Sequence, residues 1–409
     1  MKILYHSDSP TVATGFGNLS KDLLKEMVSL DKDLEITVLG INERGGYKNP
    51  EEYPYKIYPA IYDDYNDVFG FKRLVNILTG GDPEIHEVFD AVIFNYDFWL
   101  FDYIKIDGMT LFQFLKQFKA KVKNPPKLIL YTPVDNELIT PEWLEILKFF
   151  DKVIVPSMYG KGTIARADKA LGNKVKVIYY GFDPKSFYPL SDKEKLEVKK
   201  SMGAEGKFVV GYVARNQWRK DMYRVIKTFA MFHEKYKSSF LYIHCNPVDM
   251  SHDGGNLLDL CRNQGLQAGV DVAFPFGLDQ NVGLSKQMMN AIYNAMDVQL
   301  SGTTGEGFGM PFLEAMLAGT INVAPNNTTI PELFGDERGF IYQNKGSVCF
   351  GQFDNMRIRN LGDETMALRD LEYIYKNKSK IANKKKIARE WAMQWTDRRM
   401  AEELLKEIK

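Results

Sequence analysis

The sequence is poor in the residues that build covalent frameworks and metal clusters. Its 409 residues include three cysteines, Cys245, Cys261 and Cys349, and five histidines, none of them in paired ligand spacing. A disulfide framework or a zinc cluster is therefore not expected. The low cysteine content is compatible with a protein that resides in a reducing compartment. Lys plus Arg and Asp plus Glu both total 53, so the formal net charge is zero. This balance argues against a nucleic-acid partner or a general polyanion-binding surface.

Long apolar runs are also missing. No stretch approaches the roughly 18 consecutive apolar residues of a membrane-spanning helix. The chain begins with MKILYHS, which has the pattern of a strand and not of an apolar signal segment. We therefore expect a soluble cytoplasmic protein without a transmembrane segment. The sequence carries no signal for the oligomeric state, and a homodimer is compatible with it.

Short apolar runs alternate with helical patterns, which predicts parallel sheets with helices on both faces. The expected strands read KILYHS, EITVLG, AVIFNYD, KLILYTP, KVIVPS and KVKVIYY, then FVVGYVA, FLYIHCN, VAFPF, VQLSG and INVAP. A length of 409 residues is too great for one compact core. The predicted fold class is α/β, with two doubly wound Rossmann-like domains, 1–188 and 189–385, facing a shared cleft. Ligands of such sheets bind outside the carboxyl ends of the strands.

The segment SGTTGEGFGMPFLEAMLAGT follows one expected strand and opens a helix. Gly307 and Gly309 permit close approach of the backbone to a ligand, and the following proline suits the first helical position. The amides at the helix start would face an anion. Glu306 and Glu314 could accept hydrogen bonds from sugar or ribose hydroxyls. A glycine-rich turn with a surface glutamate is the plainer interpretation, but the coincidence of these features favours a site.

Two further loops at strand ends carry charge. Arg215 and Lys220 follow the strand FVVGYVA, and Asp221 is positioned to cap the next helix. The two cations could neutralise a diphosphate, although solvated loop charges explain them equally well. Asp135 and Glu137 follow the strand KLILYTP, where a carboxylate could orient an acceptor hydroxyl or stabilise positive charge on a sugar ring. Taken alone, that stretch favours an ordinary turn aspartate.

The loop SDSPTVATGFGN follows the first strand and leads into a helix near Asn18. Gly15 and Gly17, with Phe16 between them, permit close approach of a ligand. The loop does not match Gly-x-Gly-x-x-Gly, because Ser20 occupies the last position, and no Walker lysine follows. Binding of the NAD or ATP type is therefore unsupported. An ordinary flexible loop and a ligand-facing loop explain this stretch equally well.

These segments together resemble glycosyltransferase family 4, which comprises retaining enzymes of the GT-B fold. GEGFGMPFLEAMLAG followed by TTIPELFGDERGFIY is similar to the family signature and is the most specific part. SPTVATGFGN is similar to the N-terminal glycine loop, TPVDNE to the acceptor-side loop, and GYVARNQWRK to the phosphate-binding segment. VPSMYG and VIYYGFDPKSFYP resemble the end of the first domain. The resemblance covers nearly the whole chain, and TPVDNE is its least specific part.

The resemblance implies roles for the candidate residues. Glu306 would contact the transferred sugar, and Glu314 would bind the ribose. The implied catalytic set is Glu306, Asp135, Arg215 and Lys220. The implied donor-binding set is Gly15, Phe16, Gly17, Arg215, Lys220, Glu306, Gly307, Phe308, Gly309, Met310 and Glu314. No metal and no cofactor besides the donor substrate are expected, and a final helical segment, 386–409, would pack back on the first domain.

The combination of SPTVATGFGN, PVDNE and RNQWRK is most similar to a branch taken to be mannosyltransferases. This implies GDP-mannose as the donor, with a UDP-sugar as the alternative, and a glycan, glycoprotein or lipid as the acceptor. Microbes and large algal viruses carry such proteins, so the resemblance also implies one of these as the source, with a chlorella virus as a candidate. Many family members have histidine at the acceptor-side loop, so either Asp135 or Glu137 could be the corresponding carboxylate here. Residue chemistry alone does not separate guanine from uracil.

Three other functions share parts of this pattern. A nucleotide-sugar epimerase has the same two-lobed shape but uses no acceptor, so product analysis separates the two. A non-catalytic sugar-binding protein would keep the lobes, but the intact charged residues in the expected site argue against it. A dehydrogenase is disfavoured because the first loop lacks the dinucleotide fingerprint.

Overall fold

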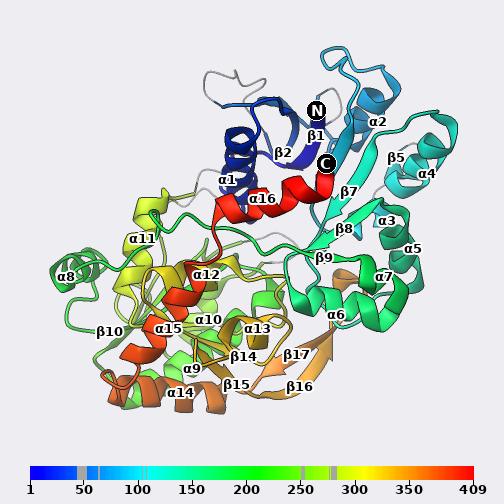
Figure 1. Cartoon of the computed structure of the whole chain (residues 1–409). Helices are drawn as coiled ribbons and strands as arrows, with labels where there is room; N and C mark the ends of the chain where they lie inside the picture. The colour runs from blue at the N-terminus through cyan, green and yellow to red at the C-terminus, as the bar shows by residue number, and fades with distance from the viewer. Residues whose placement is uncertain are drawn as a thin grey trace.

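The structure is a computed structural model that describes residues 1–43, 53–62, 65–103, 105–106, 108–249, 254–275, 277 and 283–409. It contains a seven-stranded and a six-stranded parallel sheet, which lie in the upper and lower halves of Figure 1. This arrangement confirms the predicted α/β class with two Rossmann-like halves.

The first sheet has the strand order β3-β2-β1-β4-β7-β8-β9. Its strands are β1 (Lys2–Asp8), β2 (Glu35–Ile41), β3 (Lys56–Pro59), β4 (Ala91–Asn95), β7 (Lys127–Tyr131), β8 (Lys152–Val155) and β9 (Lys176–Val177). Ile3 and Tyr5 pack in one buried cluster and Leu4 in another, because successive side chains point to opposite faces. Both faces are covered, which explains the near-continuous apolar runs in the sequence.

The second sheet has the strand order β12-β11-β10-β13-β14-β15. Its strands are β10 (Phe208–Val213), β11 (Ser239–His244), β12 (Val272–Ala273), β13 (Val298–Leu300), β14 (Ile321–Pro325) and β15 (Phe340–Tyr342). In both sheets the chain moves outward from the first strand and then returns to its other side. Such a switch point, between β1 and β4 or between β10 and β13, is where doubly wound sheets bind ligands at the carboxyl ends.

Many of the helices begin at a residue whose side chain caps them, although α2, α12, α13 and α15 have no side-chain cap. In the first half they are α1 (Gly15–Leu30), α2 (Phe71–Thr79), α3 (Leu100–Tyr103), α4 (Leu111–Lys121), α5 (Pro141–Phe149), α6 (Met158–Ala167) and α7 (Lys169–Lys174). In the second half they are α8 (Asp192–Ser201), η1 (Trp218–Lys220), α9 (Met222–Lys235), α10 (Leu257–Asn263), α11 (Lys286–Ala295), α12 (Met310–Leu317), α13 (Ile330–Phe334), η2 (Gly351–Asp354), α14 (Glu364–Lys376), α15 (Ala382–Ala392) and α16 (Asp397–Ile408). Asp221 caps α9, as predicted, by accepting a hydrogen bond from the amide of Arg224.

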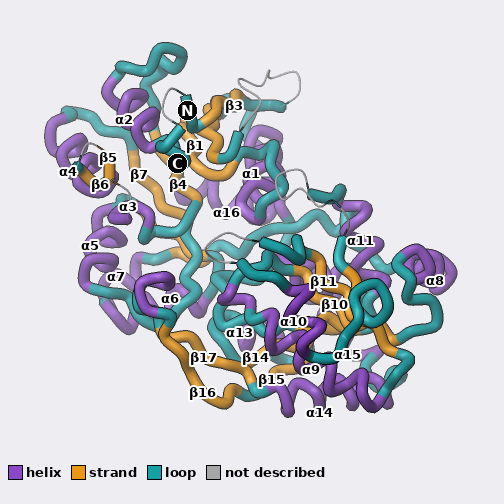
Figure 2. Tube along the Cα trace, turned by 180° about the vertical axis from the view of Figure 1, so that it is seen from behind, coloured by secondary structure: helices purple, strands orange, loops and turns teal. Residues whose placement is uncertain are grey.

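Two antiparallel hairpins were not expected from the sequence. One pairs β5 (Lys105–Ile106) with β6 (Met109–Thr110), and the other pairs β16 (Asn344–Cys349) with β17 (Ile358–Gly362). Figure 2 shows the β16–β17 hairpin below α6, at the edge of the second half. This hairpin becomes important for the site.

The chain crosses between the halves twice. Residues 178–190 lead from β9 to α8, and the last crossing leads from α15 to α16. The crossings touch, because the amide of Phe182 donates to the carbonyl of Trp395 at 3.0 Å. Helix α16 then packs against α1 of the first half (Figure 1). The exact domain limits, 1–188, 189–385 and 386–409, stay a prediction.

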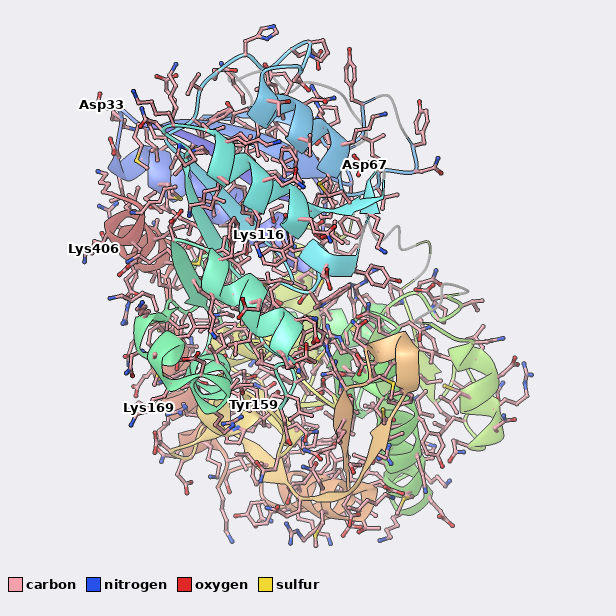
Figure 3. The ribbon with its side chains drawn as sticks, turned by 90° about the vertical axis from the view of Figure 1, so that its right-hand side faces the viewer. Asp33, Asp67, Lys116, Tyr159, Lys169 and Lys406 are labelled. Carbon is pink, nitrogen blue, oxygen red and sulfur yellow. The ribbon has the colours of Figure 1, made fainter. Side chains whose placement is uncertain are left out.

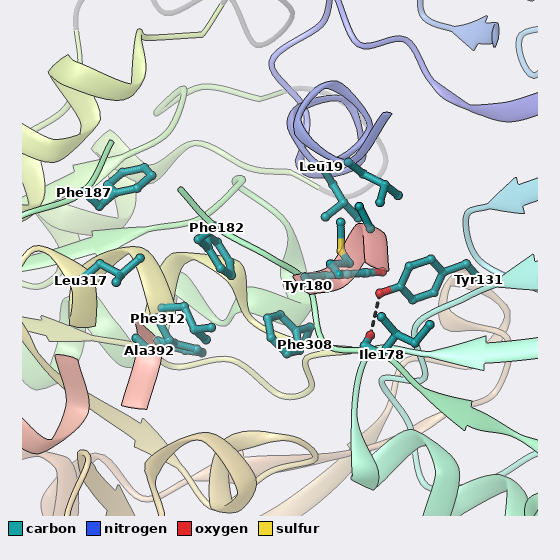
Figure 4. Close-up of a cluster of buried hydrophobic side chains, with 14 of the residues drawn as sticks. Leu19, Tyr131, Ile178, Tyr180, Phe182, Phe187, Phe308, Phe312, Leu317 and Ala392 are labelled. Carbon is teal, nitrogen blue, oxygen red and sulfur yellow. Dashed lines mark hydrogen bonds between the residues drawn. The ribbon is translucent and has the colours of Figure 1, made fainter. Parts of the chain in front are cut away.

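An aromatic cluster fills the space beside the first crossing. The rings of Tyr180 and Phe182 lie 5.1 Å and 6.4 Å from that of Phe308, and Figure 4 shows these rings between the two halves. The hydroxyl of Tyr131 donates to the carbonyl of Ile178 at 2.6 Å. Phe308 therefore contributes its side chain to the core that joins the halves.

Candidate active site

Direct contacts join the loops at the carboxyl ends of the two sheets. A methyl group on Gly307 would lie 2.3 Å from Cβ of Pro133, and one on Gly305 would lie 2.4 Å from the carbonyl oxygen of Asp135. The acceptor-side loop of the first half thus packs directly on the glycine-rich loop of the second. The expected acceptor-side and donor-side residues therefore share one location.

Glu306 holds two cations at this location. Its Oε1 atom lies 2.5 Å from Nζ of Lys220, and its Oε2 atom lies 3.6 Å from Nη1 of Arg219. Burial alone would raise the pKa of Glu306, but the charges of Lys220 and Arg219 outweigh it and lower that pKa. Burial lowers the pKa of Lys220 to about 8, although the charge of Glu306 opposes this shift. The carboxylate is therefore ionised and neutralised by its neighbours.

Sequence analysis did not select Arg219. Its Nη1 atom also donates to the carbonyl of Gly305 at 3.0 Å, and its own carbonyl accepts from the amide of Thr304 at 2.8 Å. These bonds fix the glycine-rich loop on the 3₁₀ turn η1. The only signal in the sequence was that Arg219 stands beside Lys220 in the same charged loop.

Arg215 occupies a different part of the same loop. Its charge acts on Asp8 at the end of β1, where it opposes the rise that burial causes in the pKa of that carboxyl. Asp8 accepts hydrogen bonds from the hydroxyl of Thr14 and, at 3.2 Å, from the side chain of Asn42. The charge of Arg215 therefore acts on Asp8, which precedes the N-terminal glycine loop, whereas Lys220 contacts Glu306.

The structure gives other reasons than ligand approach for several glycines. Gly307 makes room for Pro133, and a methyl group on Gly17 would lie 2.2 Å from the carbonyl oxygen of Val12. Gly309 precedes α12 with φ of 98°, a left-handed conformation that favours glycine. Of the four glycines in the expected donor-binding set, Gly15 alone has space for a methyl group, which would lie 3.6 Å from Cε of Met310.

The three larger side chains of the expected donor-binding loops all contact the hydrophobic core. Phe308 is buried in the core cluster, and Phe16 and Met310 pack against the same cluster while partly buried. The start of α12 has no side-chain cap. In its first turn Pro311 has no N–H and the amide of Phe312 donates to the carbonyl of Gly309 at 3.0 Å, so the amides of Met310 and Leu313, with those of Gly307 and Gly309, are the backbone donors at this end of the helix.

Glu314 lies farther along α12. Tyr293 donates its hydroxyl to Oε2 of Glu314 at 2.6 Å. Burial raises the pKa of Glu314, and the charge of Lys286 opposes this shift. Lys286 also forms an ion pair with Asp22 of α1, so the surroundings of Glu314 reach the first half.

Asp135 is enclosed by two arginines that sequence analysis missed. Its Oδ1 atom lies 3.3 Å from Nη1 of Arg357, and its Oδ2 atom lies 3.2 Å from Nη2 of Arg359. Arg359 also pairs with Asp354 at 2.7 Å. Burial would raise the pKa of Asp135, but Arg359, Arg357 and Arg219 outweigh it and hold that pKa well below its usual range. Asp135 is therefore a permanent anion.

Strand β17 and the turn before it contact the acceptor-side loop at both of its carboxylates, Asp135 and Glu137. Besides the contacts with Asp135, the side-chain amide of Asn360 donates to Oε1 of Glu137 at 2.8 Å. Both carboxylates that the sequence offered for the acceptor side are thus engaged by the second half. Asp97, which follows β4, lies in the field of Asp135 and these arginines and is a further titratable group that sequence analysis did not select.

A second contact between the two halves joins α6 to α13. The first turn of α6, where Tyr159 is labelled in Figure 3, is hydrogen-bonded to Glu332 of α13. Glu332 accepts hydrogen bonds from the amides of Met158 at 2.8 Å and of Tyr159 at 3.0 Å. Tyr179, in the first crossing, donates its hydroxyl to the same carboxylate. Glu332 therefore links the two halves of the protein.

Two absences can be stated for the described part of the chain. Its His, Cys, Asp and Glu side chains form no group of three or more that could hold a metal ion. None of its helices has the length and apolar character that crossing a membrane requires.

Comparison with known proteins identifies the second half. Residues 193–348 match the family described as Glycosyl transferases group 1. Mannosylfructose-phosphate synthase of Agrobacterium fabrum is 24% identical over 149 residues, which are 36% of this chain and 32% of that protein. The aligned region thus spans about a third of that relative.

Solved structures are similar over the whole chain. Sucrose-phosphate synthase of Thermosynechococcus elongatus has a TM-score of 0.72 and 16% identity, covering 99% of this chain and 98% of the other. Alr3699/HepE of Anabaena, in complex with UDP and glucose, has a TM-score of 0.67 and 16% identity, covering 100% and 99%. A structure described as OtsA in its apo form has a TM-score of 0.65 and 12% identity, covering 100% of this chain and 98% of the other.

At these identities the solved structures establish the fold, which is that of the GT-B proteins. The family match covers residues 193–348 of the second half, and Lys220, Glu306 and Glu314 lie within that range. The chain therefore carries a glycosyl transferases group 1 domain within a GT-B fold.

Proposed function

We propose that the protein is a glycosyltransferase that moves a hexose from a nucleotide diphosphate sugar to an acceptor hydroxyl with retention of configuration. The observation that carries the proposal is the buried contact between Lys220 and Glu306, with Arg219 beside it, at the carboxyl ends of both sheets. Membership of family 4, its mannosyltransferase-like branch and a chlorella-virus origin stay predictions from resemblance.

The charge arrangement supports diphosphate binding. Lys220 and Arg219 both face the single carboxylate of Glu306, which balances one of their two positive charges. An entering diphosphate would compete for these cations through strong charge-assisted hydrogen bonds. Glu306 would then be free to accept hydrogen bonds from hydroxyls of the transferred sugar. The same cations, with Arg215 and the start of α12, would stabilise the leaving diphosphate as its charge develops.

GDP-mannose is our preferred donor, and UDP-glucose is the competing one. The sequence match to a mannosylfructose-phosphate synthase supports the first, and the UDP-containing neighbour structure supports the second. The acceptor is a hydroxyl of a glycan, glycoprotein or lipid, or of a sugar phosphate, as the names of two similar synthases favour. No metal is assigned a role in the site.

Calorimetric titration with GDP-mannose and UDP-glucose, with and without chelator, tests the donor. We expect GDP-mannose to bind more tightly and chelator to leave binding unchanged. Binding of UDP-glucose alone would overturn the donor assignment but keep the function. Product analysis then separates transfer from epimerisation, because an epimerase would return an altered nucleotide sugar and would not require an acceptor.

A further inference from the structure

The residue expected to receive the acceptor hydroxyl is not available for it. Each oxygen of the Asp135 carboxylate already faces an arginine, Arg357 at 3.3 Å and Arg359 at 3.2 Å. The backbone carbonyl of Asp135 also accepts a hydrogen bond from Arg359. A carboxylate with both oxygens engaged and a depressed pKa is a weak proton acceptor.

Asp97 lies beside Asp135 on the neighbouring strand end. Strands β4 and β7 are adjacent, and Asn95 pairs with Tyr131, so Asp97 leaves the sheet next to the loop that carries Asp135. The amide of Phe98 donates to the hydroxyl of Thr132 at 3.1 Å, which fixes the turn after Asp97. The Asp97 side chain is only partly buried. It therefore combines a fixed backbone with a carboxylate that solvent still reaches.

The carboxylate of Asp97 has no side-chain partner among the described residues. Among those residues it has neither an ion pair nor a side-chain hydrogen bond. Asp135, Arg219, Arg357, Arg359 and Tyr180 are the charged and titratable groups that act on it or on which it acts. Loss of hydration, and then the charge of Asp135, raise the pKa of Asp97 to about 6, against the three arginines.

Arg357 provides a complementary donor at the same location. Its Nε atom is buried and has no hydrogen-bond partner among the described residues. The guanidinium lies 5.2 Å from the ring centroid of Trp143 and 5.8 Å from that of Trp99, and its Nη1 atom contacts Asp135. A buried N–H group without an acceptor costs free energy. The Nε atom of Arg357 therefore marks a place where a ligand with a hydrogen-bond acceptor would be stabilised.

We propose that Asp97 is the catalytic carboxylate of the acceptor side, and that Asp135 is a positioning residue that holds Arg357 and Arg359. This inference rests on the proposed glycosyl transfer. The acceptor oxygen enters on the face that the diphosphate leaves, so the configuration is retained; it forms the new bond to the anomeric carbon as the bond from that carbon to the diphosphate oxygen breaks. The nucleoside diphosphate leaves with the electron pair of the broken bond, and the hydroxyl proton passes to Asp97.

The pH dependence of turnover distinguishes the two carboxylates. Asp97 must be ionised to accept the proton, so the turnover rate should fall as the pH decreases through about 6. Asp97→Asn should lower kcat by roughly 10²- to 10⁴-fold and remove this acid limb, with little change in nucleotide affinity. Asp135→Asn should keep the limb but move it to lower pH, because the negative charge that raises the pKa of Asp97 is lost.

The experiment measures release of GDP from GDP-mannose and of UDP from UDP-glucose between about pH 5 and about pH 8, with water as the acceptor. Asp102→Asn, on the exposed face of α3, is the matched control and should leave the profile unchanged. Near-ultraviolet circular dichroism of each variant reports whether the fold persists.

An Asp97→Asn variant that is folded and retains both rate and acid limb overturns the inference while the proposed function stands. Loss of the limb in Asp135→Asn, with its retention in Asp97→Asn, overturns it equally and returns the role to Asp135. If the unmodified protein neither binds nor consumes either donor, the proposed function fails first and this inference falls with it.

Discussion

The Nζ atom of Lys220 lies 2.5 Å from the Oε1 atom of Glu306, at the boundary between the two halves of the protein. Both side chains are almost completely buried. Lys220 and Glu306 therefore form a compensated ion pair, and a diphosphate would have to compete with Glu306 for the lysine. Lys220 thus has a structural role as well as its proposed role in donor binding.

Lys220→Ala should weaken donor binding and also lower stability. A charged hydrogen bond contributes about 1.5–3 kcal/mol, which corresponds to roughly ten-fold or more in affinity. Removing one partner of a buried ion pair costs about 3–5 kcal/mol, and Arg219, which stays 3.6 Å from Glu306, would offset part of this cost. Arg262→Ala, in an exposed ion pair on α10, is the control and should affect neither property. Calorimetry and thermal unfolding measure both effects, and unchanged donor affinity in Lys220→Ala would place the diphosphate elsewhere.

Arg215→Ala and Arg219→Ala should each weaken donor binding by a similar factor, because both cations border the proposed diphosphate position. Arg219→Ala should also destabilise the glycine-rich loop, since Arg219 binds the carbonyl of Gly305. Titration with GDP and with GDP-mannose checks the expectation. If Arg215→Ala binds GDP-mannose as tightly as the unmodified protein does, Arg215 does not hold the diphosphate.

Glu306→Gln and Glu314→Gln should differ in what they impair. Glu314 is assigned to the ribose, so its loss should weaken binding of GDP and of GDP-mannose alike. Glu306 is assigned to the transferred sugar, so Glu306→Gln should lower turnover more than GDP affinity. Nucleotide binding and donor consumption are measured for both variants. Full activity of Glu306→Gln, or unaltered GDP affinity of Glu314→Gln, removes the role given to that residue.

Gly307→Ala should impair the protein without removing a ligand contact. The added methyl group would overlap Pro133, and such overpacking costs about 1–3 kcal/mol. The contact between the acceptor-side and glycine-rich loops would loosen, so both Tm and turnover should fall. Gly346→Ala, where no atom lies within 4 Å of the added carbon, is the control. A Gly307→Ala variant with unchanged Tm and turnover would show that the two loops do not meet in solution.

Asp397→Asn should stabilise the protein at alkaline pH. Burial, and then the charge of Asp22, raise the pKa of Asp397 to about 7 in the folded chain. An unfolded aspartate titrates near about 3.9. Between these values the folded state binds more protons, so the free energy of unfolding falls as pH rises and the cost is complete above about 7.

The asparagine variant should therefore gain on the order of 1–3 kcal/mol near pH 8 and nothing near pH 4, as urea unfolding would measure. Asp192→Asn is the matched control, because Asp192 is also the first residue of a helix but is exposed. An equal stability difference at both pH values would contradict the role given to Asp397.

The parallel strands could be predicted because their burial on both faces leaves a strong pattern. KLILY of β7 is an apolar run with its last four residues buried. Strand β16 has no such signal, because most of its residues are exposed and polar. The hairpin was therefore missed, and with it Arg359, which is 1% exposed although it is an arginine.

The donor side of the site was easier to predict than the acceptor side. Glu306, Lys220 and the glycine-rich loop follow strands directly, so their meeting is a consequence of the doubly wound topology. The enclosure of Asp135 by Arg357 and Arg359 depends on a contact between segments far apart in the sequence, which no local spacing encodes. Likewise, Gly307 reads as a ligand-facing glycine in the sequence, but the structure places Pro133 against it.

The central claim is that this site activates a nucleotide diphosphate sugar. The direct test is to incubate the protein with GDP-mannose and, separately, UDP-glucose, in the presence of chelator, and to measure release of the nucleoside diphosphate together with the anomeric configuration of the sugar product. We expect release of GDP from GDP-mannose, a product with the configuration of the donor, and loss of release in Lys220→Ala. No nucleotide release from either donor, or release that Lys220→Ala leaves unchanged, would contradict the account.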